Sequence, residues 1–155
     1  MNRAALSYVS LGVEDLGRAV RFYGRALGLA PEKRTRTMTF FAPGPVRLAL
    51  LPRTALLREA GITRGSGGLR AARRFSGVLL SLNVDRREEV AGLLRRVVAA
   101  GGRIVRPEAA SSWGGTTGVF ADPDGYLWEV AWNPRFRFAG SGLRRESPRP
   151  ARRSR

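Results

Sequence analysis

The residue types that most often do chemistry in proteins are scarce in this chain. It has no histidine and no cysteine, so it offers no imidazole or thiolate for catalysis or metal binding and no disulfide bond. Glu129 is a carboxylate within an alternating stretch, residues 126–132. Strand alternation puts Glu129 on the face opposite Trp128 and Val130, which we expect to pack against helices. If the Glu129 side chain is buried on its own face of the strand, its carboxylate needs a hydrogen-bond or ion-pair partner, or its pKa must be raised.

Trp113 is followed by Gly114 and Gly115. An aromatic platform beside two glycines would let a flat ligand approach the backbone closely. Packing of the indole in the core is the alternative.

Two other motifs indicate local structure rather than a site. Asp122 and Asp124 belong to residues 122–125 (DPDG), which has the composition of a turn, and a calcium loop needs several more spaced oxygens. Residues 65–68 (GSGG) are not followed by the Gly-Lys-Ser/Thr of a phosphate-binding loop, so they indicate a linker.

The first half of the chain predicts one strand, one helix and a hairpin. Residues 6–13 alternate as a strand, and Asp15 is suited to cap a helix that ends at Gly28. Residues 37–42 and 46–51 are apolar runs separated by a Pro-Gly-Pro turn, which predicts a hairpin.

The second half repeats that order. Residues 78–84 predict a strand, and Asp85 with Glu88 is a capping-box pattern at the start of a helix that ends at Gly101-Gly102. Strands are then expected at residues 103–105, 118–121 and 126–132. The repeat predicts a duplicated module: module one over residues 4–52, a linker over 53–76 with a short helix, and module two over 77–134.

Composition excludes several classes of protein. The 155 residues are 43% hydrophobic, enough for one domain with a core, over residues 1–134. No apolar run reaches the length of a membrane span and the N-terminus does not resemble a secretory signal, so we expect a cytoplasmic protein.

The net charge of +16 comes almost entirely from arginine. Residues 135–155 hold eight arginines against Glu146 alone, which predicts a disordered Arg-rich tail. Such a tail would bind nucleic acid only non-specifically, through phosphate charge, or would have no role.

Both ends of the two-module region resemble the vicinal oxygen chelate superfamily, which includes glyoxalases, bleomycin-resistance proteins and extradiol dioxygenases. The opening match is carried by residues 8–13 (YVSLGV), Asp15-Leu16, Phe22-Tyr23 and residues 27–29 (LGL). The closing match is carried by residues 120–125 (FADPDG) and 127–130 (LWEV). The resemblance implies an α+β fold in which tandem βαβββ modules form curved mixed sheets around a central cavity, and a homodimer.

The resemblance also implies where metal ligands would lie, at inward positions near the middle of the outer strands of each module. Those positions hold Tyr8, Ala49, Leu79 and Glu129, and the middle two are placed to within two residues. Only Glu129 is a suitable ligand, since a phenol is protonated at neutral pH and the other two side chains have no lone pairs. We therefore expect no metal and no other cofactor.

Arg47 shares the strand parity of Ala49, so we expect it to face the cavity. We hypothesise that an Arg47–Glu129 pair, with the Tyr8 hydroxyl nearby, replaces the metal as the polar centre. The alternative is that Glu129 is bonded only to backbone or water.

Three functions remain open. The first is capture of a flat, largely apolar small molecule in a metal-free cavity that includes Tyr8, Arg47, Ala49, Leu79, Trp113 and Glu129, for sequestration or resistance. The second is a metal-independent isomerase or lyase with Glu129 as general acid or base. The third is a nucleic-acid interaction through the basic tail.

Overall fold

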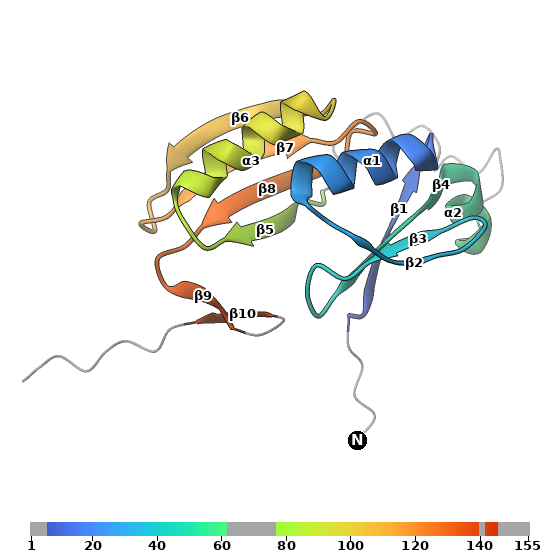
Figure 1. The fold of residues 1–155 in the computed structure, drawn as a ribbon, viewed down its shortest axis with the longest axis horizontal. Coiled ribbons are helices and arrows are strands. Elements are labelled where there is room, and N and C mark those ends of the chain that lie inside the picture. The colour runs from blue at the N-terminus through green and yellow to red at the C-terminus, as the bar shows by residue number, and fades with distance from the viewer. Residues whose placement is uncertain (1–5, 62–76, 140–141, 146–155) are drawn as a thin grey trace, which may run out of the picture.

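The computed structural model describes residues 6–61, 77–139 and 142–145. They form two α+β modules, each a four-stranded mixed sheet with a helix packed on it (Figure 1). The tandem modules and their element types are therefore as the sequence predicts. The two sheets do not close around a common cavity within the chain.

Module one consists of β1 (Tyr8–Val13), α1 (Leu16–Leu27), β2 (Pro31–Arg34), β3 (Thr39–Phe41) and β4 (Arg47–Pro52). Its strand order is β1-β4-β3-β2, with β1 parallel to β4. The ends of α1 are the predicted ones: the Asp15 side chain accepts a hydrogen bond from the amide of Arg18, and Gly28 ends the helix at φ 69°. That left-handed backbone is costly for any residue with a Cβ.

A short helix, α2 (Arg53–Glu59), follows β4 and packs on β1 and β4. It lies on the sheet face opposite α1, where the Cα of Arg53 and the side chain of Leu56 approach Gly12. Because α2 covers only the end of the strands near Gly12, the other end of this face stays open.

Module two repeats the plan with β5 (Leu80–Val84), α3 (Glu88–Ala99), β6 (Arg103–Ala110), β7 (Thr116–Ala121) and β8 (Leu127–Trp132). Its strand order is β5-β8-β7-β6, with β5 parallel to β8. Trp128 and Val130 face the core as predicted, whereas Glu129 lies on the other face.

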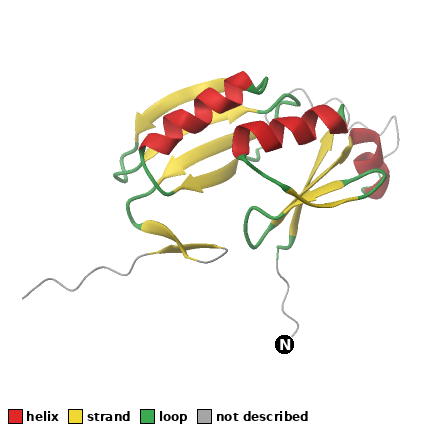
Figure 2. Ribbon diagram, viewed as in Figure 1, coloured by secondary structure: helices red, strands yellow, loops and turns green. Residues whose placement is uncertain are grey.

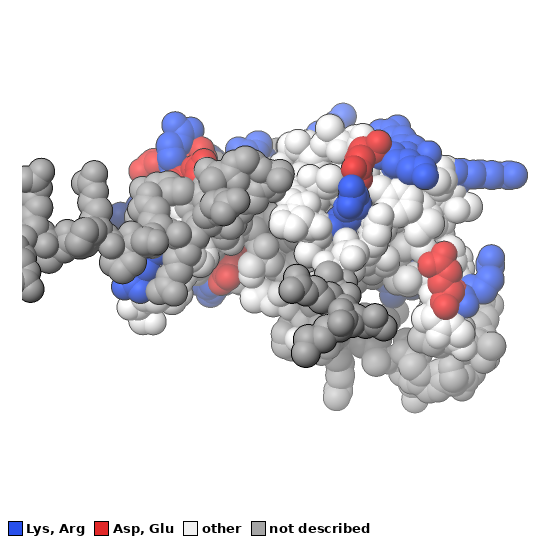
Figure 3. Space-filling view, turned by 90° about the horizontal axis from the view of Figure 1, so that it is seen from below, with Lys and Arg blue, Asp and Glu red and all other residues white. Residues whose placement is uncertain are grey.

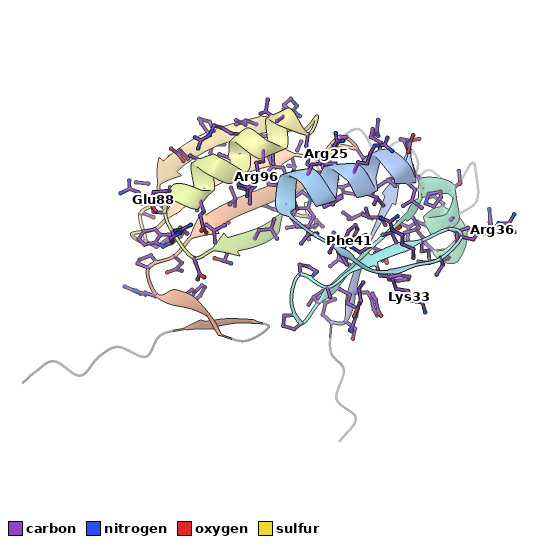
Figure 4. The ribbon with its side chains drawn as sticks, in the orientation of Figure 1. Arg25, Lys33, Arg36, Phe41, Glu88 and Arg96 are labelled. Atoms are coloured by element: carbon purple, nitrogen blue, oxygen red, sulfur yellow. The ribbon has the colours of Figure 1, made fainter. Side chains whose placement is uncertain are left out.

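The helices α1 and α3 lie side by side across the two sheets, and one hydrophobic core joins the modules (Figure 2). Phe41 contributes to the core under α1, and Arg96 reaches from α3 to the carbonyl oxygen of Ala26 on α1 (Figure 4). Polar contacts cross the same boundary. The Tyr23 hydroxyl donates to the Asp122 carboxylate at 2.7 Å, and the Tyr126 hydroxyl donates to the carbonyl oxygen of Gly12 at 2.9 Å.

Three local predictions need correction. Strand β2 is absent from the sequence interpretation because its four residues do not alternate and are largely exposed. Strand β6 is longer than predicted and passes through Pro107, which an edge strand tolerates because no neighbour needs its amide. The side chain that accepts from the backbone amides of Asp85 and Arg86, just before α3, is that of Glu89 and not that of Glu88.

Two strands lie within residues 135–155, the segment that the sequence predicts to be a disordered tail. The strands β9 (Phe136–Ala139) and β10 (Gly142–Arg145) form an antiparallel pair in which Phe138 is opposite Leu143. Residues 146–155 lie outside the described part of the chain, as do 62–76 of the predicted linker.

None of the helices in the described ranges is both long and apolar enough to span a bilayer.

Candidate functional site

The open end of the module-one sheet carries an aromatic and charged hollow of about 530 Å³, lined by Tyr8, Glu32, Lys33, Phe40 and Arg47. Tyr8 and Arg47 are cross-strand neighbours on β1 and β4. The rings of Tyr8 and Phe40 pack edge to face, with centroids 6.0 Å apart. Tyr8 and Arg47 therefore point to the same face of the sheet, as strand alternation predicts, and lie next to each other there.

Arg47 is held by Glu32 of β2 through a two-point ion pair. Its Nε donates to one carboxylate oxygen at 2.8 Å and its Nη2 to the other at 3.1 Å. The hydrogen bond lowers the pKa of Glu32 and raises the pKa of Arg47. Both side chains are 42% exposed, so the pair fixes the geometry of Arg47 more than it stabilises the fold.

An apolar groove of about 410 Å³ lies between the modules, next to the hollow. Its walls come from the start of β1, the β3–β4 loop with the start of β4, and the strands β5 and β8. The lining residues are Leu6, Val9, Pro43, Gly44, Pro45, Val46, Arg47, Leu48, Leu80, Ser81, Leu82, Asn83 and Trp128. Arg47 lines both the groove and the hollow. Seen from below, acidic and basic side chains adjoin each other on a largely uncharged surface (Figure 3).

Ala49 and Leu79, two of the four positions where the resemblance implies metal ligands, have different surroundings. Ala49 is buried between its neighbours Ser10 and Phe40. Leu79 precedes β5 and is 43% exposed, whereas the residue opposite Glu129 is Ser81. Ser81 is two residues from Leu79 and shares its parity, so the shift falls within the expected uncertainty.

Glu129 lies on the open face of the module-two sheet. Its carboxylate accepts a hydrogen bond from the Ser81 hydroxyl at 3.3 Å and lies 3.6 Å from the guanidinium of Arg106 on β6. The side chain is 26% exposed. It therefore has side-chain partners, and the alternative that it bonds only to backbone or water does not hold.

The hypothesised Arg47–Glu129 pair does not form within the chain. Arg47 is bound to Glu32, and the cation near Glu129 is Arg106. Arg47 and Glu129 lie on the strand faces that alternation predicts, but these faces belong to two separate sheets. Because those sheets do not close on each other, their inward positions do not converge.

Trp113 lies in the loop between β6 and β7 and is 45% exposed. Its indole covers Gly115, where an added Cβ would overlap the ring. The side chain therefore packs on its own loop rather than in the core, and it lines neither the groove nor the hollow.

The donor set does not fit a divalent metal ion. The residues at the positions implied by the resemblance are Tyr8, Ala49, Ser81 and Glu129, which supply a single carboxylate. Within the described ranges, no group of three or more His, Cys, Asp or Glu side chains could hold an ion. One carboxylate with hydroxyl groups would bind a divalent ion weakly.

Four residues of the hollow and of the Glu129 environment were not predicted: Glu32, Lys33, Ser81 and Arg106. Glu32 and Lys33 belong to β2, which had no alternating signal. Ser81 could have been found from the parity of β5, since it lies at an alternate position from Leu79. Of the neighbouring residues Phe40 and Phe41 on β3, Phe41 is the buried one.

Comparisons with known proteins agree with this architecture. The family model described as the Glyoxalase/Bleomycin resistance protein/Dioxygenase superfamily matches residues 5–130. The chain belongs to this superfamily. No curated protein matches it.

Several solved structures are similar to the chain. A glyoxalase-related enzyme from Fulvimarina pelagi is 34% identical, with a TM-score of 0.80, and the match covers 92% of this chain and 99% of that one. A glyoxalase/bleomycin resistance protein/dioxygenase from Nocardioides is 26% identical, with a TM-score of 0.61 and 85% of each chain covered. A family member from Burkholderia phytofirmans PsJN, 22% identical with a TM-score of 0.68 and covering 83% of this chain and 98% of that one, shows the fold alone.

Proposed function

We propose that the protein captures a flat, largely apolar small molecule in a metal-free site, as a sequestering or resistance-type member of its superfamily. The observation that carries the proposal is the apolar groove between the modules, with Arg47, Ser81 and Asn83 as its polar groups. Apolar walls with a few placed polar groups suit such ligands, because burial supplies affinity and the polar groups set orientation.

A thermal-shift screen with planar aromatic compounds tests the proposal, since a ligand of the folded state raises its melting temperature. Val46→Asp places a charge in the groove and should lower the affinity of every hit at least tenfold. Ile104→Asp is the matched control, because Ile104 is an exposed apolar residue outside the groove. Absence of hits, or equal losses in both variants, would contradict groove binding.

Metal independence is a separate prediction. Because the donor set supplies one carboxylate, dialysis of the purified protein against EDTA should change neither its melting temperature nor its affinity for a hit. Stoichiometric zinc, iron or nickel in the purified protein, measured by atomic emission, would overturn this part of the proposal.

The surroundings of Glu129 support a second candidate, a metal-independent isomerase or lyase. A carboxylate that is partly exposed and lies beside a hydroxyl and a guanidinium could accept a proton from a carbonyl substrate. Glu129→Gln separates the two candidates. An enzyme would keep its affinity for the hit and lose turnover, whereas a binding protein has no turnover to lose.

We further propose a homodimer. The open faces of the two sheets carry Tyr8, Phe40 and Arg47 on module one and Ser81 and Glu129 on module two, and a second copy would face them across the ligand site. Sedimentation velocity should give twice the 17.0 kDa mass of the chain. A monomer at micromolar concentration would contradict this proposal and leave the groove proposal intact.

A further inference from the structure

Arg47 is the one cation that lines the apolar groove among its described lining residues, and it also lines the neighbouring hollow. A ligand that fills the groove therefore lies against Arg47, at the boundary with the hollow. The chemistry at that boundary decides which ligands bind best.

The Arg47 guanidinium is held in one orientation by Glu32, and one of its edges points away from that ion pair. Its Nε and Nη2 are bound to Glu32. Within the described part of the chain, Nη1 makes no hydrogen bond. A two-point ion pair restrains the planar fork, so the edge formed by Nη1 and Nη2 presents its donors at a defined angle.

The charge around this edge remains positive. Glu32 offsets Arg47, but Lys33 lies in the same hollow and gives the cluster a net charge of +1. Lys33 extends from β2 on the lower side of module one in Figure 4. An oxyanion is therefore favoured at this boundary, while a cationic group is not.

Aromatic surface adjoins the same edge. The Tyr8 ring is 49% exposed and packs edge to face on Phe40. Because the two ring planes stand at 76° to each other, a planar ligand can lie flat on one ring and meet the edge of the other.

We propose that the preferred ligand is a planar aromatic carboxylic acid, with its carboxylate on the remaining edge of Arg47 and its ring system along the Tyr8–Phe40 pair and the groove. This inference rests on the proposed function and names the ligand class of that site.

Titration calorimetry with 2-naphthoic acid and 2-naphthamide tests the inference, because the two probes share a ring system and differ in charge. Wild-type protein should bind the acid about tenfold tighter or more, the range of a charge-assisted hydrogen bond. Arg47→Gln should lower the acid-to-amide affinity ratio until the two probes bind equally. Loss of a surface ion pair should not unfold the chain, which a melting curve checks.

Arg34→Gln is the matched control for net charge. Arg34 is an exposed residue of β2 that lines neither site, so the acid-to-amide ratio should stay at its wild-type value. Equal binding of acid and amide to wild-type protein, or equal loss of the ratio in both variants, would overturn the ligand class but not the groove proposal. Failure of both probes to bind would overturn the groove proposal and the ligand class together.

Discussion

At the scale of single residues, the ionisable groups of this chain divide by burial. Glu32, Arg47 and Glu129 lie at the surface, where ion pairs orient side chains but stabilise little. Tyr23 and Asp122 are instead buried between the modules. Asp122 accepts hydrogen bonds from the Tyr23 hydroxyl and from the amides of Asp124 and Tyr126, so its predicted turn also anchors module two on module one.

Tyr23→Phe should lower the free energy of unfolding by about 1–3 kcal/mol. The hydroxyl donates to Asp122 at 2.7 Å and accepts from the indole nitrogen of Trp128 at 3.2 Å, so its removal leaves two buried groups each short of a partner. Urea denaturation gives the value. Tyr8→Phe is the control, because Tyr8 is exposed, and should change stability by less than about 0.5 kcal/mol. Equal effects would show that the buried network adds nothing.

The stability of the folded chain should also depend on pH through the Asp122 carboxyl. Burial raises the pKa of this carboxyl above the ordinary value of 3.8, in spite of the hydrogen bonds it accepts. The folded chain then holds this proton more tightly than the unfolded chain, so stability falls as the pH rises from the unfolded pKa through the folded one. The stability of wild type minus that of Asp122→Asn should decrease over that range. A difference that increases with pH would contradict the assignment.

At the scale of elements, local signals predicted the helices better than the strands. Asp15 and Gly28 fixed both ends of α1 because capping depends on residues next to each other in the chain. The start of α3 was less certain, since Glu88 and Glu89 are both acidic residues of its first turn. Which of them turns back to the amides depends on side-chain geometry.

Glu89→Ala should destabilise the chain by about 0.5–2 kcal/mol. The Glu89 carboxylate accepts from the amides of Asp85 and Arg86 and pairs with the Arg86 guanidinium. Glu88→Ala removes the same charge from the helix N-terminus, with its dipole effect of about 0.3–1 kcal/mol, but no amide bond. Thermal unfolding of both variants isolates the cap. An equal or larger effect of Glu88→Ala would contradict it.

At the scale of the whole molecule, the modules share one core and several cross-module hydrogen bonds. They should therefore unfold together. All three tryptophans, Trp113, Trp128 and Trp132, lie in module two, so fluorescence reports that module and far-UV circular dichroism reports both. Coincident denaturation midpoints are expected. An earlier circular-dichroism transition would mean that module one unfolds alone.

The sequence by itself determined the duplicated α+β modules, the ends of α1, the faces of β1, β4 and β8, and the poor donor set for a metal. These depend on periodicity, on neighbouring residues and on residue type, which are all local. Only the tertiary structure decided that Arg47 pairs with Glu32 rather than Glu129, that Ser81 faces Glu129, and that residues of both modules line an apolar groove. Those contacts depend on strand register and on how two sheets pack, and a single strand's alternation carries no information about either.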